Sequence, residues 1–213
     1  MALTARCYLC GREICKRGTK NHILHSHMSA AGNQKCSLLK IEGFYNKDYW
    51  LYIDIPINKT LKDLDIFLRS IWLECCDHVS YFQNAKMETK INSFSFKDHI
   101  IHEYDMGNTT TTLITFVGTT WRKMQRASVR LLARNIPPRF QCAECSAAAE
   151  YICKKGPVDK FNLPYCSSCA ENYRREQEYE YYFLPITNSP RMGVCNYCGV
   201  NDTFGFVPHK DGK

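Results

Sequence analysis

Paired cysteines are the residues of this sequence that could most clearly do chemistry. The chain has 213 residues and 13 cysteines. Four C-x-x-C pairs stand out: Cys7/Cys10, Cys142/Cys145, Cys166/Cys169 and Cys195/Cys198. Each pair presents two thiolates from one tight turn, as a tetrahedral metal site requires. The N-terminus carries no apolar stretch of signal-peptide length, so we expect a cytoplasmic protein with zinc ligands rather than disulfides.

Residues 1–30 predict a zinc finger with two cysteine and two histidine ligands. The predicted ligands are Cys7, Cys10, His22 and His27. Eleven residues separate the second cysteine from the first histidine, and four separate the two histidines. His25 is an alternative to His27, because His22 and His25 have the i, i+3 spacing of one helix face. Cys15 is a further possible ligand.

Residues 140–213 predict a cysteine-rich zinc-binding module. Two C-x-x-C pairs, separated by twenty residues, would close one tetrahedral site. Its predicted ligands are Cys142, Cys145, Cys166 and Cys169. A second ion in this half is a weaker prediction, because the remaining spacings are long and irregular. Its candidate ligands are Cys153, Cys195, Cys198 and His209. In total we expect two or three Zn²⁺ ions.

An α+β central domain, residues 36–136, must hold these two zinc-stabilised modules. Its best-patterned stretch runs from residue 48 to residue 76 and predicts a strand followed by a helix. Thr60 and Asp63 form a helix-capping pair, and apolar residues then recur at helical spacing. Cys75 continues this apolar stripe, so we interpret Cys75 and Cys76 as buried structural thiols.

The charge balance favours an anionic partner. The formal net charge is +7, and two regions are strongly basic, residues 7–27 and residues 122–139. The residues that we expect to contact nucleic acid are Arg12, Lys16, Arg17, Lys20, Arg122, Lys123, Arg126 and Arg130. The second of these regions has an equally good interpretation as a solvated face where the chain leaves the domain. The longest apolar runs are too short to span a bilayer, so we expect no membrane partner.

The sequence gives little support to an enzyme. It has no nucleotide-binding glycine loop and no serine or cysteine nucleophile with a recognisable base. His99 and His102, with acidic neighbours, do not assemble a constellation that would activate water. We therefore predict a protein that is not an enzyme. A protein-protein interaction adaptor is the alternative to nucleic-acid binding, and a metal-dependent nuclease ranks below both.

Several ordered stretches carry a family resemblance. They are TLKDLDIFLRSIWLECCDHVSYF, HEYDMGNTTTTLITFVG, LLARNIPP, CAEC, YIC and LPITNSPRMGVCNYCG, within residues 36–200. Together they resemble the plasmid open-reading-frame-3-like family, which is also described as insertion-element passenger proteins. The resemblance implies a compact α+β domain with a C-terminal cysteine-rich extension, and it implies that the finger is an accessory.

This chain departs from the family pattern at two positions. Gly156 stands where members often carry a cysteine, and Cys198 stands where they commonly lack one. The ligands of a second C-terminal ion therefore stay open. The resemblance brings no established reaction with it. Joined to the basic regions, it leads to the hypothesis of a zinc-dependent nucleic-acid-binding or regulatory protein of a prokaryote or mobile element.

Overall fold

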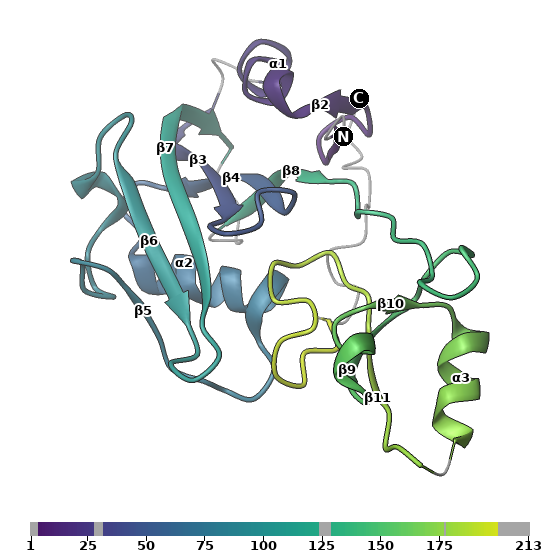
Figure 1. Ribbon diagram of the computed structural model, residues 1–213. Helices are drawn as coiled ribbons and strands as arrows, with labels where there is room; N and C mark the ends of the chain where they lie inside the picture. Colours follow the sequence, from purple (N-terminus) through teal and green to yellow (C-terminus); the bar gives the residue numbers. More distant parts are fainter. Residues whose placement is uncertain (1–3, 28–31, 124–128, 177, 200–213) are drawn as a thin grey trace.

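One large antiparallel sheet dominates the fold (Figure 1). The computed structural model describes residues 4–27, 32–123, 129–176 and 178–199. Within these ranges the sheet has eight strands: β1 (Thr4–Cys7), β2 (Glu13–Cys15), β3 (Gln34–Gly43), β4 (Trp50–Pro56), β5 (Ser80–Phe82), β6 (His99–Tyr104), β7 (Thr110–Arg122) and β8 (Arg130–Asn135). Their order across the sheet is β2-β1-β8-β4-β3-β7-β6-β5.

Strand β4 lies in the middle of this order and is buried along its whole length. Its side chains alternate between two apolar clusters, with Leu51 and Ile53 on one side and Trp50 and Tyr52 on the other. Successive strand residues point to opposite faces, so each face of the sheet has its own core. Each fully buried aliphatic side chain contributes about 1.5–3 kcal/mol to folding.

Helix α2 (Leu61–Leu68) covers the first face of the sheet. The predicted capping pair is confirmed: the Asp63 N–H donates to Thr60 Oγ1, and the Thr60 N–H donates to Asp63 Oδ2 at 3.0 Å. The helix passes into a π-helical turn, Arg69–Leu73, and ends there. The buried side chains of α2 and this turn continue the largest apolar cluster.

The finger, residues 4–27, covers part of the opposite face. Its strand β1 pairs with β8, and its helix α1 (Thr19–Ser26) places Ile23 in the second apolar cluster. Leu24 packs against the same cluster. The finger is therefore continuous with the large sheet through the hydrogen bonds of β1, and it is also held by apolar burial.

The C-terminal half forms a smaller unit beside the sheet (Figure 1). Among the described residues it contains a three-stranded sheet in the order β10-β9-β11, with strands β9 (Tyr151–Lys155), β10 (Pro164–Tyr165) and β11 (Tyr182–Pro185). Helix α3 (Ser167–Arg175) packs with these strands. Residues 186–199, which we name the strap, then return from this unit to the large sheet, where Asn188 and Ser189 hydrogen-bond to β8 and to the turn after α2.

The structure is mostly β with few helices, so the α+β expectation holds only loosely. In the described residues three α-helices occur, and each is short. The predicted strand-to-helix unit is present as β4 and α2. The helical spacing of apolar residues in that unit did not indicate the structure of the rest of the domain. The β-branched and aromatic stretches around it form one extended sheet.

Candidate metal centres

The finger brings its four predicted ligands together. The ligand atoms of Cys7, Cys10, His22 and His27 all lie within 4.8 Å of one another. Cys7 Sγ lies 3.5 Å from His27 Nε2, and Cys10 Sγ lies 3.5 Å from His22 Nε2. Zinc with bonds of about 2.0–2.1 Å to nitrogen and 2.3 Å to sulfur needs ligand atoms about 3.3–3.8 Å apart in a tetrahedron. The cluster could therefore hold a metal ion.

Local backbone structure explains this convergence. The Gly11 N–H donates to Cys7 O at 2.8 Å, and Gly11, which directly follows Cys10, has a φ of 76°, which closes the tight turn that carries both cysteines. Helix α1 then presents His22, and His27 follows at its C-cap. His25 is exposed and lies outside the cluster, so the structure selects His27 of the two alternatives. Cys15 is exposed and also lies outside it.

The C-terminal unit brings together the four cysteines predicted for its first site. Cys142, Cys145, Cys166 and Cys169 have all four Sγ atoms within 4.8 Å of one another. Cys145 Sγ lies 3.6 Å from Cys166 Sγ and 3.7 Å from Cys169 Sγ. These separations match the tetrahedral edge of about 3.8 Å for four zinc–sulfur bonds. Three of the thiols pack with the aromatic core of this unit, so metal binding and folding would be coupled here.

A third cluster joins two distant parts of the chain. The ligand atoms of Cys75, Cys76, His78 and Cys195 lie within 4.8 Å of one another. Cys195 Sγ is 3.6 Å from His78 Nε2, although the two residues are 117 positions apart. The interpretation of the vicinal cysteines as buried thiols was wrong for Cys76, which is exposed, whereas Cys75 is half-buried and packs against the largest apolar cluster. The π-helical turn ends at Leu73 and leaves both outside the helix.

Among the described residues, the ligands predicted for a second ion in the C-terminal half do not come together. Cys153 is buried in the aromatic core and donates to Lys155 O at 3.3 Å. Cys198 is exposed and donates to Asn196 O at 3.4 Å. Neither belongs to a described cluster, and Cys195 belongs to the third one. His209 lies outside the described residues.

Thiol acidity differs within the clusters. Burial acts to raise the pKa of Cys142, but backbone N–H groups outweigh it and lower the pKa to about 6. A hydrogen bond with His78 lowers the pKa of Cys195 to about 7. Hydrogen bonding to Cys75 instead raises the pKa of Cys76 to about 11. Neighbouring thiolates repel one another, so a central dication is what would allow every thiol in a cluster to ionise.

The predicted basic contacts fall into two different environments. In the finger, Arg12 and Arg17 are exposed, whereas Lys16 Nζ pairs with Glu42 Oε1 at 2.7 Å and Lys20 is half-buried. In the second basic region, residues 122–139, the arginines of two strands bind one buried carboxylate: Arg122 Nη1 lies 2.8 Å from Asp54 Oδ1, and Arg130 Nη2 lies 2.5 Å from Asp54 Oδ2. Lys123 is exposed, and Arg126 lies outside the described residues.

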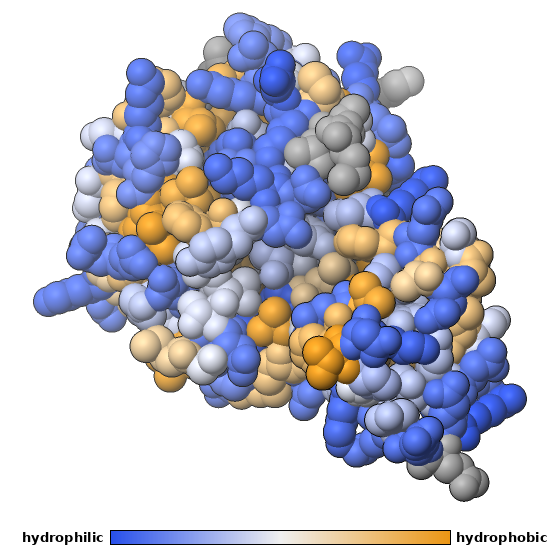
Figure 2. All heavy atoms as spheres, in the orientation of Figure 1, coloured by the Kyte–Doolittle hydropathy of each residue, from blue (hydrophilic) through white to orange (hydrophobic). Residues whose placement is uncertain are grey.

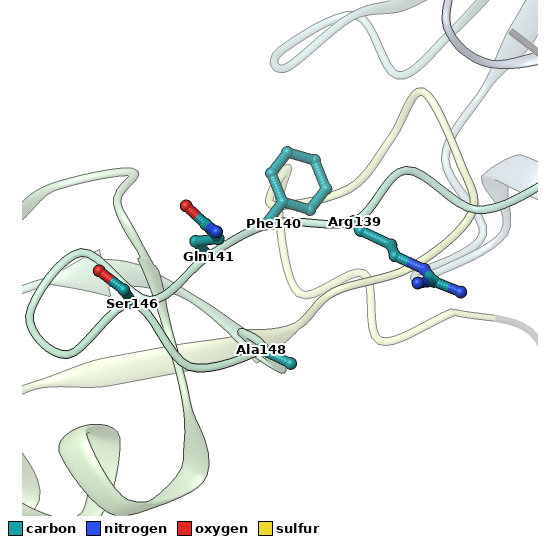
Figure 3. A pocket seen from close by; sticks show the side chains of 5 residues that line it. All are labelled: Arg139, Phe140, Gln141, Ser146 and Ala148. Carbon is teal, nitrogen blue, oxygen red and sulfur yellow. The ribbon is translucent and has the colours of Figure 1, made fainter. Parts of the chain in front are cut away.

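A pocket of about 550 Å³ lies beside the first cysteine turn of the C-terminal unit. Its lining residues are Arg139, Phe140, Gln141, Ser146 and Ala148 (Figure 3). Figure 3 shows the Arg139 side chain extending away from Gln141 and Ser146. Arg139 is the charged residue among these described lining residues.

The comparisons with known proteins give no family. No family model matches the chain, and no curated protein matches it. Among solved structures, it is similar to MM3350, a protein of unknown function from Methanosarcina mazei Go1, with a TM-score of 0.42 and 17% identity over 47% of this chain and 70% of the other. Within the described residues, no helix has the length and apolar character needed to cross a membrane.

Proposed function

We propose that this protein is a zinc-dependent nucleic-acid-binding or regulatory protein whose finger contacts the phosphate backbone. The donor sets support zinc as the metal. The finger and the third cluster combine thiolates with imidazole, and the cluster of the C-terminal unit is built from four thiolates. These are the ligand types that zinc takes in structural sites. Each cluster already offers four ligands, so none leaves an open position of the kind that catalytic zinc needs.

The observation that carries nucleic-acid binding is a ring flanked by two cations at the edge of the finger. Phe96 is 59% exposed. Lys20 Nζ, from helix α1, lies 5.0 Å from its ring centroid, and Lys97 Nζ lies 5.5 Å from it. An exposed ring on which a base can stack, beside cations that can meet phosphates, is how proteins bind single strands with little sequence preference.

The surface around the finger agrees with this assignment. Arg12 and Arg17 are exposed on the finger. In the view of Figure 2, hydrophilic residues gather over the top of the molecule, where Figure 1 places α1 and β2. A single finger provides little sequence specificity, since one such unit contacts about three base pairs. We therefore assign it backbone contact and stacking rather than recognition of a long sequence.

The test is an anisotropy titration of the zinc-loaded protein with labelled single-stranded and duplex oligonucleotides at several salt concentrations. We expect binding whose affinity falls linearly with the logarithm of salt concentration. Phe96→Ala should weaken single-strand binding by about 1–3 kcal/mol. Lys62→Gln, which removes an exposed lysine from α2 on the other face of the sheet, is the matched control. Absent or salt-insensitive binding of the wild type would reject the proposal.

A protein-interaction adaptor is the second candidate, and one loop favours it. Between β9 and β10, Val158 is 92% exposed, Phe161 is 45% exposed and Leu163 is 37% exposed. Exposed apolar side chains in one short loop are a feature of protein-binding surfaces. A partner that stays bound in equal amounts after nuclease treatment, and that is lost with Phe161→Asp, would place this function first.

Three further assignments belong to the same proposal. We place the protein in the cytoplasm, since reduced thiols are what its clusters need. We assign it to the plasmid open-reading-frame-3-like family of mobile elements on the resemblance of its sequence blocks. We rank a metal-dependent nuclease last, and cleavage of an oligonucleotide by the metal-loaded protein would reverse that order.

A further inference from the structure

The strap packs against the large sheet through polar contacts that its own sequence supplies. Ser189 Oγ donates to Trp72 O at 2.6 Å, at the end of the π-helical turn. Asn188 O accepts from Arg134 Nη2 at 2.6 Å, and Asn135 Nδ2 donates to Asn188 Oδ1 at 2.7 Å. These bonds place residues 188 and 189 between β8 and the turn after α2.

Arg191 anchors the strap in the protein interior, and its guanidinium also contacts the third cluster. Its side chain is fully buried, and its Nη2 donates to Asp105 Oδ2 at 2.6 Å. Its Nη1 donates to Thr110 Oγ1 at 2.9 Å. The same Nη2 lies 3.4 Å from Cys75 Sγ. A guanidinium aimed at a sulfur stabilises the thiolate form, as hydrogen-bond donors around metal ligands do.

The donor set of the third cluster is chemically complete. Three thiolates and a neutral imidazole around a dication carry a net charge of about −1, and Arg191, which also pairs with Asp105, directs an N–H toward one of the sulfurs. Asp77 has a φ of 55° and Cys195 a φ of 51°. These left-handed turns bring His78 back toward the vicinal cysteines and direct Cys195 to meet them.

We propose that Cys75, Cys76, His78 and Cys195 form a third closed zinc site that latches the strap onto the large sheet. Binding of Zn²⁺ displaces the thiol protons to solvent and leaves three zinc–sulfur bonds and one zinc–nitrogen bond. The site goes beyond the proposed function, because it needs no nucleic acid. Its occupancy decides whether the strap is docked.

The third site should also be the first of the three to lose its metal. The Cys7–His27 pair of the finger spans 20 positions, and the Cys145–Cys169 pair of the C-terminal unit spans 24. Cys195 and His78 are 117 positions apart. Short spans let a small module assemble its ligands locally, whereas the third site exists only while the sheet is folded and the strap is docked.

The test measures zinc per chain in the purified, reduced full-length protein. We expect three ions in the wild type and two in Cys195→Ser. Cys198→Ser removes the other, exposed cysteine of the same C-x-x-C pair and should retain three. Two ions in the wild type, three in Cys195→Ser, or equal loss in both variants would overturn the proposal. If Cys195→Ser fails to fold, Cys76→Ser replaces it, because that side chain is exposed.

Limited digestion with trypsin measures directly whether the strap is docked on the large sheet. Arg191 is fully buried, so cleavage after it requires the strap to leave the sheet. We expect cleavage at Arg191 to rise at least about tenfold in Cys195→Ser, and in wild type after a chelator has removed the first ion. Cleavage at exposed Arg175 should be unchanged. Release of the first ion without exposure of Arg191 would rule out the latch, whatever the nucleic-acid titration shows.

Discussion

The finger and the second basic region, residues 122–139, both carry several cations, but two arginines of each lie in opposite environments. The finger leaves Arg12 and Arg17 exposed. The second region directs Arg122 and Arg130 inward to Asp54, which is fully buried in β4. The difference comes from the neighbouring strand, because Asp54 is in register with Arg130 on β8.

This comparison shows that a run of basic residues need not form a basic surface. A buried carboxylate is costly unless cations and hydrogen-bond donors satisfy it, and Asp54 recruits two arginines for that purpose. Those guanidinium groups are then held against Asp54. In the finger, one lysine is held in a similar way: Lys16 pairs with Glu42, which is 8% exposed.

The largest effect is expected from removing the charge of Asp54. In Asp54→Asn the two arginines lose their ionised partner, and we expect unfolding free energy to fall by about 3–5 kcal/mol. Urea denaturation of the zinc-loaded protein measures it. Asp159→Asn, at an exposed position, should change stability by less than about 0.5 kcal/mol. A loss below about 1 kcal/mol in Asp54→Asn would mean that these arginines are free to act elsewhere.

The next effect tests the exposed cations of the finger. Arg12→Gln combined with Arg17→Gln should weaken oligonucleotide binding by about tenfold and reduce the salt slope by about 0.7–0.9 for each phosphate that is no longer neutralised. Stability should change by less than about 0.5 kcal/mol, because both side chains are exposed. Lys62→Gln combined with Lys86→Gln is the matched control for net charge. An equal weakening in the control pair would show that only total charge matters.

A smaller effect should follow from freeing Lys16. Glu42 Oε1 accepts from Lys16 and Glu42 Oε2 accepts from Lys40, each at 2.7 Å. Burial acts to raise the pKa of Glu42, but these lysines outweigh it, so the folded-state pKa lies below the unfolded one. Glu42→Gln should cost about 1–3 kcal/mol at neutral pH. Lys16 would keep its hydrogen bond to Lys47 O at 2.6 Å but lose its ionised partner, so it should slightly strengthen oligonucleotide binding.

The sign of the pH dependence follows from that lowered pKa. The stability from Glu42 is complete above its unfolded-state pKa of about 4.3 and is lost as the pH falls through the folded-state pKa. The difference in unfolding free energy between wild type and Glu42→Gln should therefore shrink toward zero with acid. Both proteins should release zinc to the same extent, so the difference isolates the carboxylate. A difference that grows with acid would contradict the assignment.

Local patterns predicted the parts of the molecule whose partners are near in sequence. The β4–α2 unit, with Thr60 capping the helix, follows from periodicity and capping chemistry. The two clusters in the finger and the C-terminal unit follow from ligand spacing, because each set comes from one short segment. Ligand spacing within a short segment does not depend on the tertiary fold.

The sequence patterns did not predict contacts between segments that are distant along the chain. The third cluster depends on the strap returning to the sheet, and nothing near Cys75 and His78 indicates Cys195. Helical spacing suggested that Cys75 continues the stripe of α2, but the π-helical turn ends two residues earlier. The burial of Arg122 likewise depends on the sheet order, in which β3 alone separates its strand β7 from Asp54 on β4. Sequence reasoning treats each such residue with its neighbours along the chain, whereas the fold pairs it across the sheet.

The smallest expected effect concerns Lys123, the exposed residue beside buried Arg122. Lys123→Gln should weaken oligonucleotide binding no more than about threefold and reduce the salt slope by at most about 0.9, the value for one phosphate contact. The same anisotropy titration measures it beside Arg12→Gln, a single substitution at a similarly exposed cation. If Lys123→Gln costs more affinity than Arg12→Gln, the phosphate path runs over the end of β7. The two basic regions would then meet at that strand end, where Arg122 pairs with buried Asp54 and Lys123 would face the ligand.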